Sequence, residues 1–267
     1  MRRTTPRAAL GLLYASLLIL PLGRAQSTAS QSYHEGLSFL SAGSFKAAQV
    51  SLSSLCQAGM QGADVLENIG RAYLRILPND SPPSGTTGAE IVQRVGHAAC
   101  LAAQKQFDNA HEEYRALEQE YPKYPYLHYA VGRFWADMDD VSAAVAEFQQ
   151  ELKNQPNDIN SRLEIAAAEY KLDSAAGLPY AEEAVKLNPD VPSAHYLLGL
   201  LYLDTDNYGK AIHELETARR AFPKDAKICF ALGSAYARAG RKEDAARARA
   251  AFAELNKQSA SSADARH

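Results

Sequence analysis

The sequence predicts an all-α fold, an α-solenoid of stacked antiparallel helix pairs, and three observations support this prediction. Ala, Leu, Glu and Gln are used heavily, and no alternating apolar and polar stretch is long enough for a convincing strand. Prolines recur with one period, and two series of small residues share it, which marks duplicated structural units. The prolines are Pro122, Pro156, Pro189 and Pro223, and the two series of small residues are Ala98, Gly132, Ala166, Gly199 and Gly233, and Ala110, Ala144, Gly177, Ala211 and Ala245.

Each series has a physical reason in a unit of two antiparallel helices. The first small residue lies in the middle of one helix and the second lies in its partner, so the two backbones can approach closely. A proline just beyond the second helix prevents that helix from continuing. In one such unit Pro192 opens a helix in its first turn, and Gly199 and Tyr202 share its packing face.

These residues resemble the tetratricopeptide repeat, a pattern of about 34 residues with Leu-Gly, Tyr, Ala and Pro at fixed spacings. Leu198-Gly199, Tyr202, Ala211 and Pro223 match it in one unit, and Leu232-Gly233, Tyr236 and Ala245 match it in the next. The resemblance implies a right-handed superhelix. The tandem units would span 91–124, 125–158, 159–191, 192–225 and 226–257, and the unit at 159–191 lacks one residue near Asp173.

The pattern also extends toward the N-terminus, where Gly36 and Gly70 are separated by one full repeat period. Residues 29–77 are therefore predicted to hold one repeat-like unit and an orphan helix over 63–77. The Pro, Gly, Ser and Thr composition of residues 78–90 predicts a surface loop in place of a second helix. Residues 258–267, rich in Ser and Ala, are predicted to form a disordered tail.

Residues 1–25 have the pattern of a secretory signal peptide. Arg2, Arg3 and Arg7 give a basic start, residues 8–22 are almost entirely apolar, and residues 23–25 put small residues where a signal peptidase reads. An uncleaved membrane anchor is the alternative, but fifteen helical residues reach only about 22 Å. The sequence therefore predicts export to the periplasm or outside the cell, with cleavage after Ala25.

Composition and charge narrow the class of partner. The chain is 46% hydrophobic and 22% charged, which is typical of a globular protein and leaves no membrane span after cleavage. Residues 1–25 contain four Arg and no acidic residue, so without them the chain carries 24 Lys and Arg against 31 Asp and Glu, a net charge of −7. Nucleic-acid binding needs a basic face, so we expect no nucleic-acid partner.

The three cysteines, Cys56, Cys100 and Cys229, form no CxxC pair and do not have metal-ligand spacing with a histidine. An odd number in an oxidising compartment leaves at least one thiol unpaired. All three are predicted to lie inside helices as small apolar side chains. The sequence leaves open a disulfide between Cys56 and Cys100.

No enzyme motif is present, so the sequence predicts no catalytic residue, cofactor or metal. His128 and His195 occupy equivalent repeat positions, where packing explains them better than catalysis. Asp137, Asp139 and Asp140 would suit Ca²⁺ by their chemistry. They fall in a turn between two helices, however, where an Asp caps the following helix.

The resemblance implies that first helices line the concave side of the superhelix, where partner segments bind. Aromatic side chains with a few cations are typical of binding hot spots. In this register the predicted partner-binding residues are Tyr126, Tyr129, Arg133, Tyr170, Tyr196, Leu200, Leu203, Lys227, Phe230 and Arg238. The Lys and Asn clamp of relatives that grip chaperone C-termini is missing, so we expect a more apolar or aromatic ligand.

Three functional hypotheses follow from these observations. The leading one is a non-enzymatic adaptor of the cell envelope or secreted space that binds protein or peptide segments in an aromatic groove. The second is a structural solenoid that self-associates end to end, because no polar capping helix is evident after Lys257. The third is an enzyme whose site carries no known motif.

Overall fold

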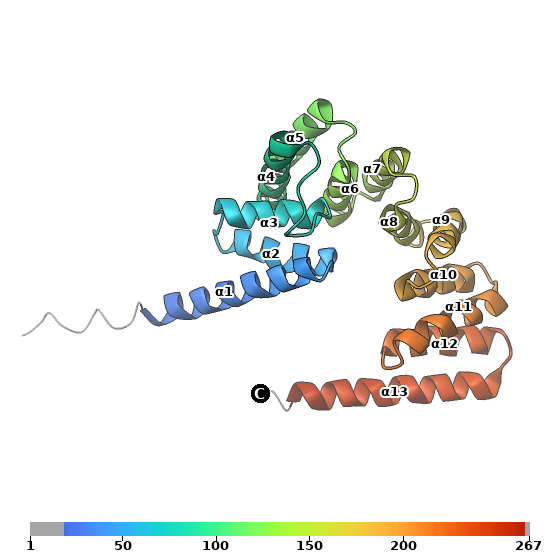
Figure 1. Cartoon of the computed structure of the whole chain (residues 1–267). Helices are drawn as coiled ribbons and strands as arrows, with labels where there is room; N and C mark the ends of the chain where they lie inside the picture. The colour runs from blue at the N-terminus through green and yellow to red at the C-terminus, as the bar shows by residue number, and fades with distance from the viewer. Residues whose placement is uncertain (1–18, 265–267) are drawn as a thin grey trace, which may run out of the picture. The chain divides into compact units, whose positions relative to one another are not determined.

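The computed structural model describes residues 19–264, and in that range the chain forms thirteen helices and no strand (Figure 1). The prediction of an all-α fold is confirmed. Residues 1–18, most of the predicted signal peptide, lie outside the described residues, as do the last three residues of the predicted tail. Across 19–264, no helix combines the length and the apolar character that crossing a membrane requires.

The chain divides into two compact units, one up to Leu127 and one from His128 onward. The first contains α1 (Ile19–Ser41), α2 (Phe45–Gln57), α3 (Ala63–Tyr73), α4 (Gly85–Ala103) and α5 (Phe107–Glu120). The second contains α6 (Leu127–Asp137), which starts at the boundary, α7 (Val141–Asn154), α8 (Ile159–Glu169), α9 (Ser174–Leu187), α10 (Pro192–Asp204), α11 (Tyr208–Ala221), α12 (Ala226–Arg238) and α13 (Lys242–Asp264).

Within each unit, helices that follow one another in sequence pack against one another (Figure 1). In the second unit α8 contacts α10 and α10 contacts α12, so the first helices of successive pairs lie side by side. A continuous apolar core fills α8–α13, with Leu201, Leu215 and Leu232 completely buried. This core fixes the order of the first helices and therefore the face that they present.

Where the small residue of a first helix is glycine, it makes room for a side chain of the second helix. A Cβ atom on Gly199 would lie 2.7 Å from Leu215 Cγ, and one on Gly132 would lie 2.6 Å from the Phe148 ring. Gly36 has the same relationship with Leu52, again sixteen positions later. Close packing of the two helices, expected from the spacing of small residues, therefore depends on the missing Cβ.

The turn inside most helix pairs contains one residue with positive φ. These residues are Gly43, Lys105, Asp139, Asp206 and Gly240, with φ between 60° and 76°. The pair formed by α8 and α9 differs, because there Asp173 has φ −147° and accepts a hydrogen bond from Ala175 N–H. The missing residue near Asp173 thus removes the left-handed position from this turn.

Helix α3 is not an orphan, which differs from the expectation for residues 63–77. It ends at Tyr73 and packs against α4, which already begins at Gly85, so the loop covers 74–84 instead of 78–90. A Cβ atom on Gly70 would lie 1.8 Å from Val92 O, and one on Gly96 would lie 1.9 Å from Leu66 O. These two glycines let the α3 and α4 backbones touch, which compensates for the missing helix.

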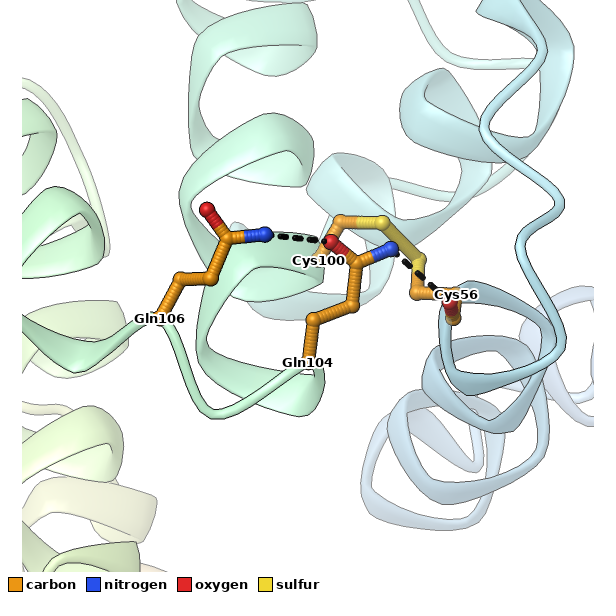
Figure 2. The surroundings of a disulfide bond; sticks show 4 residues. All are labelled: Cys56, Cys100, Gln104 and Gln106. Carbon is orange, nitrogen blue, oxygen red and sulfur yellow. Dashed lines mark hydrogen bonds between the residues drawn. A yellow bond between two sulfur atoms is a disulfide. The ribbon is translucent and has the colours of Figure 1, made fainter.

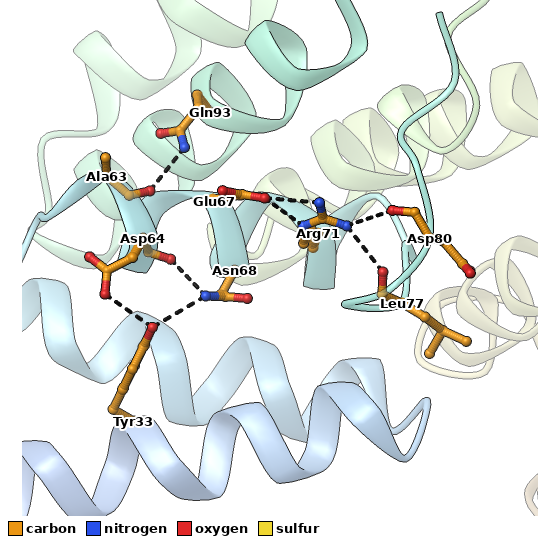
Figure 3. A network of polar contacts seen from close by, with 9 residues as sticks. All are labelled: Tyr33, Ala63, Asp64, Glu67, Asn68, Arg71, Leu77, Asp80 and Gln93. Atoms are coloured by element: carbon orange, nitrogen blue, oxygen red, sulfur yellow. Dashed lines mark hydrogen bonds and ion pairs between the residues drawn. The ribbon is translucent and has the colours of Figure 1, made fainter. Parts of the chain in front are cut away.

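The loop after α3 is anchored by Arg71 (Figure 3). The Arg71 guanidinium pairs with Glu67 and donates to the carbonyls of Leu77 and Asp80 at 3.1 and 3.0 Å. Near the opposite end of α3, the Tyr33 hydroxyl of α1 donates to Asp64. A loop that composition alone marks as a surface loop therefore has a fixed course.

A disulfide joins Cys56 at the end of α2 to Cys100 in α4, with a Cα–Cα distance of 5.3 Å (Figure 2). Gln104 Nε2 donates to the Cys56 carbonyl at 2.9 Å, and Gln106 donates to the Gln104 side chain. Cys229 is a buried free thiol. The pairing that the sequence left open is present, and the third cysteine is buried in α12 as a small apolar side chain would be.

The chain ends of the described range also differ from the expected boundaries. Helix α1 begins at Ile19 and runs without a break past Ala25, the predicted cleavage point. Helix α13 continues to Asp264, so its backbone is helical through most of the predicted tail. A helix can extend beyond the residues that pack against its neighbours, so the end of the repeat pattern at 257 does not mark the end of α13.

Candidate partner-binding face

The first helices of the second unit carry nine of the ten predicted partner-binding residues. On α6, Tyr129 is only 3% exposed and its ring lies 5.6 Å from that of Phe148. Arg133 is bound by Glu164 of α8 at 3.1 Å and by Asp137 at 3.0 Å. Both residues therefore serve the packing of α6, α7 and α8, and neither presents a large open surface.

Two of the predicted tyrosines, Tyr170 and Tyr196, lie close enough to interact electrostatically. Tyr170, at the end of α8, is 39% exposed, whereas Tyr196 of α10 is half-buried against the core. Burial raises the pKa of the Tyr196 hydroxyl, and the Asp225 carboxylate and Tyr170 raise it further. The Tyr196 hydroxyl is therefore a hydrogen-bond donor at neutral pH, beside an exposed aromatic ring.

The apolar residues of α10 and α12 continue this surface. Leu200 and Leu203 are partly buried against the core. Phe230 is 60% exposed, and its ring lies 5.4 Å from that of Phe252 on α13. We call Tyr170, Tyr196, Leu200, Leu203 and Phe230 the first-helix face.

The remaining predicted residues are placed differently. Lys227 is exposed at the start of α12. Arg238 pairs with Asp206 across 3.5 Å, with both side chains mostly exposed. Tyr126 belongs to the first unit, where the Arg75 guanidinium lies 5.7 Å from its ring centre. It is therefore not grouped with the first-helix face.

A cavity of about 160 Å³ lies between α6, α7 and α8. Alanines and two larger apolar side chains form its interior, and charged side chains surround it. The apolar residues are Ala136, Val141, Ala144, Phe148, Ala167 and Ala168, and the charged residues are Arg133, Asp137, Asp139, Glu164 and Lys171. Lys171 Nζ is 3.9 Å from Asp139 Oδ1.

Of the charged residues in this cavity, the sequence predicted only Arg133 as a partner-binding residue. Lys171 occupies the same repeat position as Arg238, so the register could have identified it. Asp137 occupies that position one repeat earlier, but it stands in an acidic turn. Glu164 gave no signal, because its importance comes from a contact with the neighbouring repeat.

The acidic turn and the histidines have structural partners. Asp137 pairs with Arg133, and the Asp140 carboxylate accepts from Ala143 N–H at 3.0 Å and caps α7. His195 Nδ1 lies 2.5 Å from Glu214, and its Nε2 lies 2.8 Å from the Pro189 carbonyl. His128 pairs with Glu147, and the two residues are separated by 19 positions, as His195 and Glu214 are. The expected capping and packing roles account for these side chains.

Two family models with the same description, tetratricopeptide repeat, match this chain. One matches residues 101–159 and 198–263, the other matches 166–228, and together they match more than half of the chain. The chain belongs to the tetratricopeptide repeat family. The matched residues begin at the end of α4 and cover α5 and most of the second unit, whereas α1–α3 and nearly all of α4 lie outside them.

Solved structures of tetratricopeptide repeat proteins share this fold. MamA from Desulfovibrio magneticus RS-1 is 23% identical, with a TM-score of 0.58, over 62% of this chain and 94% of that one. YrrB, described as a TPR protein with an unusual peptide-binding site, is 17% identical, with a TM-score of 0.55, over 61% of this chain and 84% of that one. At these identities the likeness concerns the fold.

A curated relative, Superkiller protein 3 of Schizosaccharomyces pombe, is 29% identical over 135 residues. The match covers 48% of this chain but only 10% of that protein. This chain therefore spans only a small part of the length of that relative. Tetratricopeptide repeats of this type are protein-interaction scaffolds, and such proteins are generally non-enzymatic.

Proposed function

We propose that this chain is an exported adaptor that binds segments of partner proteins on its first-helix face. The observation that carries the proposal is the exposure of Phe230 and Tyr170 beside the half-buried Tyr196 on consecutive first helices. Exposed aromatic side chains next to partly buried leucines are typical of binding hot spots. Such a surface suits an extended or helical segment with apolar side chains.

Two observations support export. Residues 1–25 have the basic, apolar and small-residue regions of a signal peptide. The Cys56–Cys100 disulfide fits an oxidising compartment, because such bonds persist in the periplasm or outside the cell and are rare in the cytosol. Sequencing the N-terminus of the protein purified from its host tests this: a start at Gln26 supports export, and a retained Met1 argues against it.

The binding proposal is tested with photo-crosslinking groups placed at Tyr170 and Phe230 in the full chain. We expect both to crosslink the same partner, identified by mass spectrometry. Phe230→Ala should reduce capture of that partner by about tenfold, the effect of losing a hot-spot side chain. Phe222→Ala is the matched control, because Phe222 is also half-exposed but lies in the turn between α11 and α12. Equal loss in both variants contradicts the proposal.

A second candidate is self-association, and the distribution of charge favours it. Residues 128–207 carry 14 acidic and 5 basic side chains, whereas residues 208–267 carry 7 acidic and 12 basic ones. Opposite charges at two places in one chain can attract two copies, and salt weakens that attraction. Sedimentation at low and high salt tests this candidate: a monomer at every concentration and salt level removes it.

A further inference from the structure

We infer that the cavity between α6, α7 and α8 is a binding site for a Lys or Arg side chain of a partner segment. The inference rests on the proposed function, because it names the chemistry of a partner that the second unit binds. It concerns a site separate from the aromatic residues of α10 and α12. The interior of the cavity, its charged rim and the charge of the surrounding repeats each support it.

The size and interior of the cavity suit a long aliphatic stem. Its volume is about 160 Å³, and engineered apolar cavities of roughly 150 Å³ hold a molecule as large as benzene. Ala136, Ala168 and Val141 provide an apolar wall. Lys and Arg bury their methylene groups along such surfaces and keep the charged end near water.

The rim is short of positive charge. Glu164 and Asp137 both bind Arg133, whose side chain is only 14% exposed, so that cation is already neutralised inside the wall. Asp139 is different, because its side chain is 88% exposed and its ion pair with Lys171 is a loose contact of 3.9 Å. A pair this exposed contributes little energy and exchanges easily. An incoming ammonium or guanidinium group can therefore replace Lys171 at Asp139.

The repeats around the cavity favour a basic partner over an acidic one. Residues 128–207 have an excess of nine negative charges. Such a surface attracts a basic segment over several ångströms and repels an acidic one. A purely apolar side chain could enter the cavity but would gain nothing from Asp139. The geometry and the charge thus agree on one class of side chain.

The test uses three blocked amino acids as probes: N-acetyl-lysine amide, N-acetyl-norleucine amide and N-acetyl-glutamate amide. Norleucine has the same four-carbon stem as lysine without the charge. Each is titrated into the ¹⁵N-labelled full chain, and the amide signals of Ala136, Val141 and Ala168 are followed. We expect the lysine probe to bind about threefold to fivefold more tightly than the norleucine probe, the factor that one exposed ion pair supplies. Equal binding of the two, or tighter binding of the glutamate probe, overturns the inference.

Three variants sharpen the test. Asp139→Asn should remove the preference for lysine, Lys171→Gln should increase affinity for the lysine probe, and Ala168→Leu should fill the cavity and abolish the shifts. Asp190→Asn and Ala176→Leu are controls, because both residues are exposed outside the cavity. A gain of affinity in Lys171→Gln cannot come from misfolding. Unchanged shifts in Ala168→Leu contradict the site.

Failure of the cavity inference can be told apart from failure of the proposed binding on the first-helix face. The probes report on the cavity alone, whereas crosslinking at Phe230 reports on a partner at α12. If Ala168→Leu instead abolishes salt-sensitive association of the chain with itself, the occupant is a second copy and the assignment to a separate partner protein is overturned.

Discussion

The Tyr236 hydroxyl donates a hydrogen bond of 2.5 Å to Glu216 Oε1, which lies on the second helix of the preceding repeat. Tyr202 makes the same bond to Glu182, with both partners placed one repeat earlier in the chain. The tyrosine that identifies each of these repeats in the sequence therefore also links that repeat to its predecessor. This link adds a polar contact to the apolar packing between neighbouring units.

Tyr236→Phe should lower the free energy of unfolding by about 1.5 kcal/mol, because it removes a hydrogen bond to a charged group while keeping the ring. The ring also contacts the Arg241 guanidinium at 4.7 Å, which Phe retains. Urea unfolding measures the change. Tyr208→Phe is the control, since the Tyr208 hydroxyl bonds Asp206 at the exposed surface and should matter by less than about 0.5 kcal/mol. Equal losses would argue against a linking role for Tyr236.

The stabilisation by Tyr236 should depend on pH in the alkaline range. Burial, followed by the hydrogen bond to Glu216, raises the pKa of Tyr236 to about 12 in the folded chain, against about 10 when unfolded. The contribution is therefore complete below about pH 10 and is lost as the pH rises through about 12. The difference in unfolding free energy between wild type and Tyr236→Phe should shrink over that interval. A difference that stays constant contradicts the assignment.

Loss of the disulfide should destabilise the first unit strongly. Cys56 and Cys100 are 44 residues apart, and closing a loop of that length is worth about 4 kcal/mol in the chain-entropy model. Thermal unfolding with and without dithiothreitol measures this. The double variant Cys56→Ser, Cys100→Ser should unfold at the lower temperature under both conditions. A wild-type chain that is insensitive to reductant while fully reduced would contradict this expectation.

Gly199→Ala should destabilise the second unit by about 2 kcal/mol, since its Cβ would meet Leu215 at 2.7 Å in a filled core. Gly209→Ala is a matched control on the next helix, where a Cβ meets nothing within 4 Å. That change should be neutral or stabilise by up to about 1 kcal/mol, because Ala favours helix. Unfolding monitored by circular dichroism compares the two, and an equal effect would show that the close packing at Gly199 is unimportant.

The repeat period predicts the helix pairs because each period marks a side chain that packs in every unit. Gly132 and Gly199 recur because Phe148 and Leu215 need their space. The pairing of α3 with α4 has no such signal. It depends on Gly70 and Gly96, whose separation in sequence differs from the repeat period. The sequence therefore suggests that α3 has lost its second helix, whereas in the structure α4 packs against it.

The candidate site was less predictable than the fold, because register gives position on a helix and does not give burial. Tyr129 and Phe230 hold the same repeat position, yet Tyr129 is 3% exposed and Phe230 is 60% exposed. Each ring contacts a phenylalanine of the second helix of its own pair, Phe148 for Tyr129 and Phe252 for Phe230, so the position in the repeat does not determine how much of the ring is exposed. The cavity is lined by alanines of two neighbouring repeats, Ala136 and Ala144 in one and Ala167 and Ala168 in the next, and the pattern within a single repeat does not show that they meet.

The loop at 74–84 lies between the two cysteines in sequence, since Cys56 precedes it and Cys100 follows it. Exposed loops are the preferred places for proteases to cut a folded chain. A single cut between residues 74 and 84 would leave both fragments covalently joined through the Cys56–Cys100 bond. The nicked chain would migrate as one band until it is reduced, so the bond protects the assembly even where the backbone is broken.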